Sequence, residues 1–326
     1  MPSTGNCWRA DMPDGNRILI IKHSALGDLA LAFGPMQAIR AAHPGAHITL
    51  LTIKAFESLA RASGLVDEVW IDERPKLFRI GAVSKLRRRL REGGFDRVYD
   101  LQTSSRTAWY FRLFWPGPWP EWSGTVKGCS HPHRDPERPN MHLVEMQSGQ
   151  LADAGIADTP LSDLSWWDAD ISRLDLPRRY AVLLPGGAAH RPEKRWPAMH
   201  FAAIAARLAA AGAIPVIVGG PPESAEAAEI QATCPASINL IGHTSLLDLA
   251  PIMRGACVVV GNDTGPMHVA ALVGAPVIVM FGSASSPAES RPRAHPGAPE
   301  PRILQAADLA SLPVETVWKE VSDILR

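Results

Sequence analysis

The sequence predicts an α/β protein built from two Rossmann-like domains in series. Three observations support this fold class: short apolar runs alternate with helical patterns from residue 17 onward, the alternation restarts near residue 180, and glycine-containing turns follow several apolar runs. Strands that alternate with amphipathic helices are typical of βαβ units and a mostly parallel sheet. Two such halves predict two domains with parallel sheets that face each other across a cleft.

The length of 326 residues agrees with two domains of about 150 residues each. Apolar residues make up 46% of the chain, which is enough to build a sizeable core. Residues 155–178 interrupt the alternation and are interpreted as the connection between the domains. We therefore divide the chain into domains 1–165 and 166–326.

The first domain begins with the apolar run of residues 17–22, predicted as a strand. A helical pattern follows, with Leu29 and Phe33 on one face, and it ends at residues 43–45, His-Pro-Gly. Further elements are predicted in the order strand 47–53, strand 68–71, helix 79–92 and strand 97–101. Residues 116–140 hold six prolines and three glycines without periodicity, so we predict a long irregular loop there.

The second domain repeats the pattern. Strands are predicted at 180–184, 214–218, 238–241, 257–260 and 276–281, and helices at 197–211, 222–233, 245–254, 265–273 and 313–325. Pro215 belongs at the start or the edge of its strand, because proline cannot donate a backbone hydrogen bond. Residues 287–301 are predicted as a loop, and the last helix is a candidate to pack back on the first domain.

Charge gives no global case for nucleic-acid binding, because 33 Lys and Arg residues balance 33 Asp and Glu residues. Four cysteines without a C-x-x-C pair argue against a disulfide framework and fit a reducing compartment. The polar N-terminus lacks the apolar region of a signal peptide, and no run of about 18 apolar residues predicts a membrane span. These observations predict a cytoplasmic protein, still able to touch a membrane surface.

Residues 261–268, Gly-Asn-Asp-Thr-Gly-Pro-Met-His, are the strongest local signal, because they follow a predicted strand and open a predicted helix. A helix N-terminus offers unpaired backbone N–H groups and the positive end of the helix dipole, and glycine lets an anion approach the backbone. The pattern favours a phosphate site over the simpler interpretation that Asp263 and Thr264 only cap the helix.

Residues 24–28, Ser-Ala-Leu-Gly-Asp, also lie between a predicted strand and a predicted helix. They do not form the G-x-G-x-x-G pattern of nicotinamide cofactor sites. Asp28 either caps the helix that follows or acts as a general base at the carboxyl end of the first strand, where open α/β sheets bind ligands.

Residues 186–197 follow the first predicted strand of the second domain and contain Gly187, Lys194 and Arg195. A flexible backbone with cations near a helix start suits a diphosphate. The simpler alternative is a solvated basic loop in which Trp196 only packs.

Together these three motifs, in this order and spacing, resemble glycosyltransferase family 9, the ADP-heptose:lipopolysaccharide heptosyltransferases. The motifs are Ser-Ala-Leu-Gly-Asp at 24–28, Lys-Arg-Trp-Pro at 194–197 and Gly-Asn-Asp-Thr-Gly-Pro-Met-His at 261–268. The resemblance covers residues 17–285 and implies the GT-B fold, with an acceptor-side N-terminal domain and a nucleotide-sugar-binding C-terminal domain. It also implies an inverting transfer without a catalytic metal and without a cofactor beyond the nucleotide-sugar co-substrate.

The resemblance assigns roles at the matching positions. Asp28 matches the proposed base, and Lys194 matches a lysine on the phosphate side of the donor. The donor-binding positions are Asp263 near the sugar, Thr264 and Gly265 at the diphosphate, His268 one turn later, and Glu223 at the ribose. Gly187, in the loop before Lys194, completes the predicted donor site.

The chemistry accounts for these residue types. Inversion at an anomeric carbon needs a base that takes the proton of the acceptor hydroxyl as it attacks opposite the leaving group. The leaving nucleoside diphosphate gains negative charge, which a helix N-terminus and Lys194 can stabilise without a metal. The resemblance thus implies transfer of a heptose from ADP-heptose to a lipid-linked lipopolysaccharide-core acceptor, at the cytoplasmic face of the inner membrane.

Between Arg74 and Arg91 the chain carries eight Lys and Arg residues and no acidic residue. Leucine and isoleucine lie at helical spacing in this run, so a solvated amphipathic helix is one interpretation. The other is a patch for an anionic acceptor or an anionic membrane surface, for which Arg87, Arg88 and Arg91 are the candidate residues.

Two other functions remain open on this architecture. A nucleotide-sugar 2-epimerase would convert a UDP-sugar without an acceptor, and a non-catalytic protein would bind the donor without depending on Asp28. A metal site is not predicted, since the spacing of Cys129, His131, His133 and His142 matches no zinc pattern.

Overall fold

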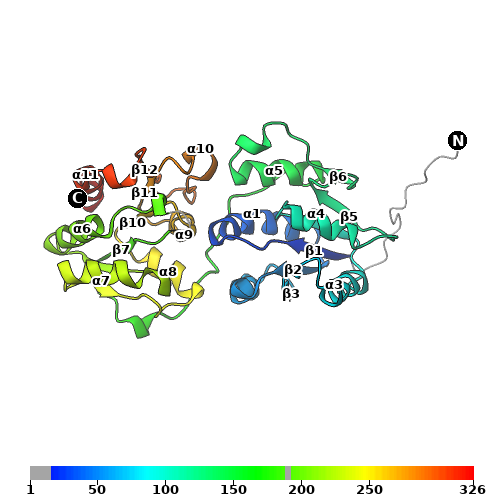
Figure 1. The fold of residues 1–326 in the computed structure, drawn as a ribbon, viewed down its shortest axis with the longest axis horizontal. Coiled ribbons are helices and arrows are strands. Elements are labelled where there is room, and N and C mark those ends of the chain that lie inside the picture. Colours follow the sequence, from blue (N-terminus) through cyan, green and yellow to red (C-terminus); the bar gives the residue numbers. More distant parts are fainter. Residues whose placement is uncertain (1–15, 188–191) are drawn as a thin grey trace. The chain divides into compact units, whose positions relative to one another are not determined.

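The computed structural model describes residues 16–187 and 192–326, which fold into two compact units (Figure 1). Unit 1 contains the described residues up to Ala25 together with Leu31–Ser162, and unit 2 contains Leu26–Ala30 together with the described part of Asp163–Arg326. Each unit has a six-stranded sheet, and every neighbouring pair of strands in it is parallel. The predicted α/β class with two parallel sheets is confirmed.

The sheet of unit 1 has the strand order β3-β2-β1-β4-β5-β6. Its strands are β1 (Arg17–Ile21), β2 (His47–Thr52), β3 (Glu68–Ile71), β4 (Arg97–Asp100), β5 (Glu121–Gly124) and β6 (His131–Pro132). The helices of this unit are α1 (Leu26–Ala42), of which the first five residues belong to unit 2, α2 (Glu57–Ala62), α3 (Ile80–Glu92), α4 (Ser105–Arg112) and α5 (Leu143–Asp153). The order reverses between β1 and β4, so their carboxyl ends flank the topological switch point, where open α/β sheets bind ligands.

The sheet of unit 2 has the strand order β12-β11-β10-β7-β8-β9. Its strands are β7 (Tyr180–Leu184), β8 (Ile214–Ile217), β9 (Ile238–Asn239), β10 (Val259–Asn262), β11 (Val277–Phe281) and β12 (Arg302–Gln305). The helices are α6 (Ala198–Ala210), α7 (Ser224–Thr233), α8 (Leu249–Arg254), α9 (Gly265–Leu272), α10 (Pro287–Ser290) and α11 (Val314–Leu325). Counted from β7, the order equals that of unit 1, and the switch point lies between β7 and β10.

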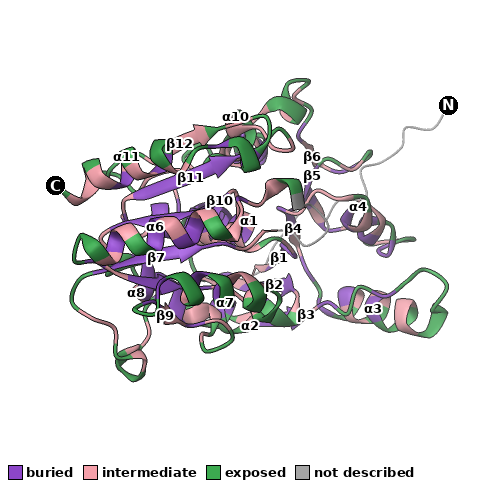
Figure 2. Ribbon diagram, turned by 60° about the vertical axis from the view of Figure 1, so that its left-hand side comes forward, coloured by how far each residue is buried: buried purple, intermediate pink, exposed green. Residues whose placement is uncertain are grey.

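Both faces of the unit 2 sheet are covered by helices. One core contains Leu183 of β7 with side chains of α6, α7 and α11, and a second contains Val182 and Leu184 with side chains of α8 and α9. Successive residues of a strand point to opposite faces, so β7 contributes to both cores and is buried along its whole length (Figure 2). The last helix, α11, packs on α6 and β11 of this unit.

In unit 1, α3 and α4 bury Leu86, Leu90 and Phe111 in one core with Trp122 of β5.

None of the described helices is long and apolar enough to cross a membrane.

Pro35 lies inside α1 and has no N–H to donate to the carbonyl of Leu31. The buried hydroxyl of Ser162 takes over this role: it donates to Leu31 O (2.9 Å) and accepts from Gly34 N (2.7 Å). Gly34 has no room for a side chain, because a Cβ there would lie 2.2 Å from Pro160 O. The end of unit 1 is thereby fastened to the middle of α1.

Two predicted loops contain regular structure. Residues 116–140, predicted as irregular, hold β5 and β6, and residues 287–301 hold α10. β5 and β6 lie in a segment rich in proline and glycine and contain no apolar run that would reveal a strand, and pairing with β4 in register Arg97 to Glu121 defines β5. Pro215 is the second residue of β8, and β9 pairs only with the two residues after it, so its predicted place at a strand start is confirmed.

Candidate functional site

A cavity of about 390 Å³ lies at the switch point of unit 2. Its walls come from three loops, residues 186–187 after β7, residues 219–223 after β8 and residues 263–266 after β10. The cavity brings together the predicted donor residues Gly187, Glu223, Asp263, Thr264 and Gly265. Its volume and its position at the carboxyl ends of the strands are typical of a small-molecule site.

The N-terminus of α9 borders this cavity. Thr264 is the N-cap residue, and its hydroxyl donates to Asn262 O (3.2 Å) instead of accepting a hydrogen bond from the helix. Gly265 and Pro266 begin the helix, so no side chain of Gly265 covers the first turn. The structure thus shows an uncapped helix N-terminus at the cavity wall, where the dipole and the first N–H groups favour an anion.

Lys194 and Asp263 meet at this wall. Lys194 ends a short 3₁₀ turn, Pro192–Lys194, and its Nζ lies 3.2 Å from Asp263 Oδ2. The two side chains are 14% and 11% exposed, so the pair is largely shielded from water. A cation and a carboxylate predicted from distant parts of the sequence therefore lie side by side at the cavity.

Arg195 and Glu223 fix the loops around the cavity. Arg195 donates from Nη2 to Gly187 O and from Nη1 to Glu226 Oε1, both at 2.7 Å, which ties the loop after β7 to α7. Glu223 Oε2 accepts from Gly220 N (2.9 Å). A Cβ on Gly186 would lie 2.9 Å from Glu223 Cγ, so glycine there allows the two loops to approach.

Asn262 is a residue of the site that sequence reasoning did not single out. Its side chain is fully buried and donates from Nδ2 to Pro185 O (2.9 Å) and Gly186 O (3.0 Å), while Oδ1 accepts from Trp196 N (2.9 Å). One amide thus holds together the loop after β7 and the segment that carries Lys194. A polar residue at the end of an apolar strand is the signal that could have revealed it.

Replacing Asn262 with alanine is expected to lower the free energy of unfolding by about 2–4 kcal/mol, because it removes two buried hydrogen bonds and one partly buried hydrogen bond and leaves their backbone partners unpaired. Denaturant unfolding at 25 °C measures this loss. The control is Asn140→Ala at an exposed position of unit 1, where a change within about 0.5 kcal/mol is expected. Equal stability of the two variants would contradict the bridging role of Asn262.

Asp28 lies in the first turn of α1, within the segment Leu26–Ala30 that belongs to unit 2. This segment contacts the start of α9 within that unit. A Cβ on Gly27 would lie 2.6 Å from His268 Cδ2, and a Cβ on Gly265 would lie 2.8 Å from Gly27 N. Glycine at both positions permits this close approach, so the turn that carries Asp28 lies beside Gly265 and His268.

At the switch point of unit 1, Gln102 holds the chain that leads to this turn. Gln102 Oε1 accepts from His23 N (2.8 Å) and Ser24 N (3.2 Å). Lys22, which is buried, donates from Nζ to Leu101 O (3.3 Å). Gln102 was not predicted as a site residue, although a polar side chain directly after β4 lies at the ligand-binding edge of the sheet.

Asp72 follows β3 and is buried. It accepts from Tyr110 Oη (2.6 Å) and from Arg74 N (2.7 Å), and it lies 3.0 Å from His23 Nε2. Burial raises the pKa of the Asp72 carboxyl, but the contacts with His23 and Tyr110 outweigh it and the pKa lies below its ordinary value. The ionised carboxylate therefore fixes both His23 and the start of the segment that precedes α3.

Asp100 ends β4 and is also buried. Its Oδ1 accepts from Gln102 N (3.1 Å) and Thr103 N (2.9 Å), but burial dominates and raises the pKa of Asp100 to about 6. Since this pKa lies above the ordinary value of 3.8, the folded chain binds the proton more tightly than the unfolded chain. The contribution of Asp100 to the free energy of unfolding therefore falls as the pH rises from about 4 to about 6.

Asp100→Asn is expected to remove this fall and to raise the free energy of unfolding at pH 7 by about 2–3 kcal/mol. The amide oxygen can still accept from the two backbone N–H groups. Denaturant unfolding of both proteins at pH 4 and pH 7 measures the effect as a difference of pH dependence. Parallel curves for the two proteins would show that Asp100 is not the group responsible.

The predicted acceptor residues Arg87 and Arg91 hold the loop that follows α4. Arg87 Nη2 donates to Trp115 O (2.7 Å), and Arg91 donates to Phe114 O (2.7 Å) and Gly117 O (2.9 Å). These carbonyls follow the C-terminus of α4, where cations are favourable. Arg88 instead is exposed, 4.0 Å from Glu92.

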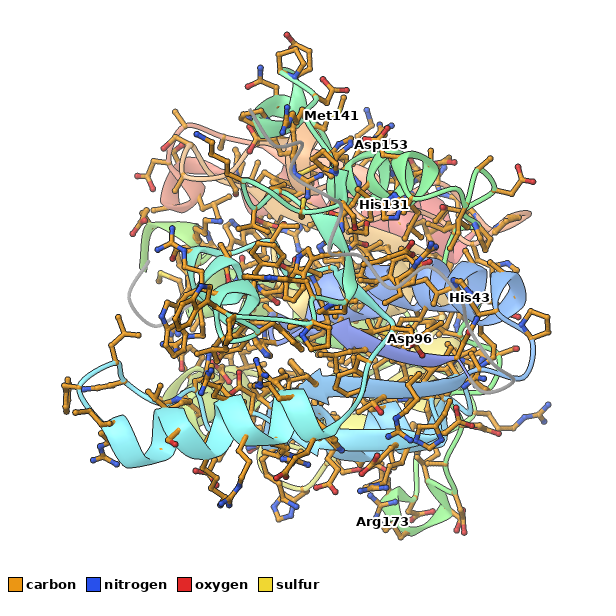
Figure 3. All side chains as sticks on the ribbon, turned by 90° about the vertical axis from the view of Figure 1, so that its right-hand side faces the viewer. His43, Asp96, His131, Met141, Asp153 and Arg173 are labelled. Carbon is orange, nitrogen blue, oxygen red and sulfur yellow. The ribbon has the colours of Figure 1, made fainter. Side chains whose placement is uncertain are left out.

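The cysteine and histidines that sequence analysis rejected as zinc ligands have other contacts. His133 Nδ1 lies 2.8 Å from Asp153 Oδ2, and His142 Nδ1 accepts from Val144 N (3.2 Å) as the N-cap of α5. Figure 3 shows Asp153 at the end of α5 beside β6, which carries His131. Among the described residues, no group of three or more His, Cys, Asp or Glu side chains is arranged to hold a metal ion.

Comparisons with known proteins agree with the motifs. The family model "Glycosyltransferase family 9 (heptosyltransferase)" matches residues 83–296. The chain is 30% identical over 308 residues to lipopolysaccharide heptosyltransferase 2 of Escherichia coli (strain K12), with 86% of each protein covered.

Solved structures show the same fold. The ADP-heptose lipopolysaccharide heptosyltransferase II of E. coli has a TM-score of 0.78 at 24% identity and covers 95% of this chain and 98% of its own. An E. coli heptosyltransferase with ADP has a TM-score of 0.74 at 20% identity and covers 94% of this chain and 99% of its own. The predicted GT-B fold class is confirmed.

Proposed function

The chain belongs to glycosyltransferase family 9, and on this premise we propose that it transfers a heptose from ADP-heptose to a lipid-linked, lipopolysaccharide-core-type acceptor. The names of its relatives support this choice of donor sugar and acceptor. The observation that carries the proposal is the cavity of unit 2, which combines glycine-containing loops, an uncapped helix N-terminus and a cation.

In this proposal the donor diphosphate lies over the N-terminus of α9, with the backbone of Thr264 and Gly265 donating to its oxygens. Gly187 leaves room beside the diphosphate. Glu223 takes the ribose hydroxyls, because a carboxylate accepts two hydrogen bonds from neighbouring hydroxyl groups. Asp263 and His268 lie toward the sugar.

The proposed reaction inverts the anomeric carbon. The acceptor hydroxyl attacks that carbon, its proton passes to the Asp28 carboxylate, and the bond between the anomeric carbon and the diphosphate oxygen breaks. Asp28 is suited to this role because its turn lies against Gly265 and His268 at the start of α9.

Charge stabilisation in this proposal comes from the protein and needs no metal. The leaving ADP gains negative charge on its diphosphate, and preorganised donors at such a position contribute large rate effects. Lys194 supplies a full positive charge, and its present partner Asp263 keeps it at the cavity wall.

The acceptor is expected at unit 1, and its lipid anchor would bring the enzyme to the cytoplasmic face of the inner membrane. Arg88 is the most accessible of the three predicted acceptor residues, because Arg87 and Arg91 already donate to backbone carbonyls. Anionic groups on the acceptor would pair with such exposed guanidinium groups.

A thermal-shift screen with ADP, UDP, GDP and ADP-heptose tests the donor. A ligand at 100 times its dissociation constant adds about 2.7 kcal/mol of stability. A shift with ADP and ADP-heptose alone is expected. A shift with a UDP or GDP species would replace the donor but keep the reaction class.

A transfer assay with ADP-heptose and a detergent-solubilised acceptor then tests the reaction by the release of ADP. Conversion of a UDP-sugar without any acceptor would instead identify a 2-epimerase. Donor binding without transfer, unaffected by Asp28→Asn, would identify a non-catalytic binding protein.

A further inference from the structure

Exposed apolar side chains gather at one point of unit 1. Five large apolar residues are highly exposed among the described residues, and three of them, Leu77, Phe78 and Ile80, lie within four positions at 65%, 74% and 79% exposure. In Figure 2 the chain that leads into α3 is coloured as exposed, and in Figure 3 it projects at the left edge as a cyan loop. We call residues 74–81 the tip.

The basic run around the tip divides into two groups. Three arginines are half-buried and already make contacts within the protein. Arg87 and Arg91 donate to carbonyls after α4, and Arg89 stacks 4.2 Å above the Trp70 ring. Five cations are exposed, namely Arg74, Lys76, Arg79, Lys85 and Arg88.

Few acidic side chains pair with the exposed cations. Arg88 lies 4.0 Å from Glu92, and no ion pair joins the other four to an acidic side chain within residues 16–187 and 192–326. The acidic neighbours of the run in sequence are Glu73 and Glu92, both exposed. The tip therefore combines three exposed apolar side chains with an excess of positive charge.

The base of the tip is anchored, so its exposure is built into the fold. Asp72 accepts from Arg74 N (2.7 Å) and from Tyr110 Oη (2.6 Å), and Arg106 donates to Pro75 O (3.2 Å). These contacts hold residues 74 and 75, where the chain enters the tip. The apolar side chains beyond them remain in water.

We propose that the tip docks the protein on an anionic phospholipid bilayer. Leu77, Phe78 and Ile80 enter the interface between headgroups and acyl chains, and the five exposed cations pair with lipid phosphates around them. Membrane binding by such segments scales with the buried apolar area and with the attraction of basic residues to anionic lipids. This inference names the surface of the protein that contacts the membrane. It rests on the proposed function in one respect, namely that the acceptor is anchored in a bilayer by a lipid.

Charge favours a bilayer over a second copy of the chain. In a symmetric dimer with the tips at the two-fold axis, the exposed cations of both copies would come together. Like charges that lose water at an interface repel each other. An anionic lipid surface satisfies the apolar side chains and the cations together.

Co-sedimentation of the full-length protein with vesicles tests the proposal. The vesicles contain phosphatidylethanolamine with either anionic phosphatidylglycerol or neutral phosphatidylcholine. Binding to the anionic vesicles is expected, weakening as salt rises from about 0.05 M to about 0.5 M. The variant Leu77→Ser/Phe78→Ser/Ile80→Ser is expected to bind at least about tenfold more weakly, and Lys76→Ser/Arg79→Ser about 25-fold more weakly at low salt.

Matched controls change similar residues elsewhere. Met199→Ser removes a side chain that is 63% exposed on α6, and Lys127→Ser/Lys319→Ser removes two exposed cations outside the tip. Both are expected to bind vesicles like the unmodified protein. Melting temperatures of all variants verify that they fold.

Three results would overturn the proposal: no binding of the unmodified protein to anionic vesicles at low salt, unchanged binding of the tip variants, or a dimer that the apolar triple variant dissociates. The results that would refute the proposed reaction differ from the results that would refute membrane docking. Vesicle binding through the tip without sugar transfer would refute the transfer alone, and transfer in detergent without vesicle binding would refute the docking alone.

Discussion

Asp28→Asn is expected to lower kcat by about 10²–10⁴-fold, because an amide cannot take the proton of the attacking acceptor hydroxyl. The substitution keeps the size and shape of the side chain in the first turn of α1. Donor binding is expected to persist, since the diphosphate is assigned to the start of α9. Steady-state release of ADP with acceptor present measures kcat, and the thermal shift with ADP measures donor binding.

The control for this variant is Asp158→Asn, which makes the same chemical change at an exposed position of unit 1. It is expected to turn over like the unmodified enzyme. Turnover of Asp28→Asn within a few-fold of normal would remove Asp28 from the role of base, whatever the donor proves to be. Loss of the ADP-induced shift would instead indicate damage to the donor site.

Lys194→Ala is expected to lower kcat/KM by about 10²–10³-fold, the usual effect of removing a donor that faces developing charge. The variant also leaves Asp263, 11% exposed, without its cation at 3.2 Å. An uncompensated carboxylate would then face the donor diphosphate. Both effects act on the leaving group, so kcat should fall even when the donor is saturating.

Lys194→Arg retains the positive charge and should recover part of the lost activity, because guanidinium also pairs with phosphate. Lys319→Ala, at an exposed position of α11, serves as the neutral comparison. If Lys194→Ala raised KM for the donor and left kcat unchanged, Lys194 would bind the ground state without stabilising the departing diphosphate.

Much of the fold could be predicted because its signals are local. The boundaries of β3 and β7 were predicted to the residue, since each is an apolar run between turn residues. Two of the three loops that line the cavity of unit 2, residues 186–187 and 263–266, lie in glycine-containing segments that the sequence singled out, because glycines and helix starts are visible in sequence. The third loop, residues 219–223, lies outside the motifs, and only Glu223 of it was predicted. The parallel class followed from the alternation of these elements.

Other elements depend on partners far away in the chain. β6 has two residues and is defined by its pairing with β5, so no pattern within it could predict a strand. Asn262 bonds to Trp196, Pro185 and Gly186, between 66 and 77 positions earlier. Gln102 likewise holds backbone groups 78 and 79 positions earlier. The bridging role of such side chains can be recognised only when the sheet brings their loops together.

The sequence by itself determined the fold class, the family and the residue types at the proposed donor site, because glycine, helix-start and charge patterns are properties of short segments. The tertiary structure decided which of the eight cations between Arg74 and Arg91 are available. Arg87 and Arg91 satisfy carbonyls that the end of α4 leaves unpaired, and Arg89 covers Trp70. A charge run does not show this division, because backbone carbonyls elsewhere in the fold must be satisfied first.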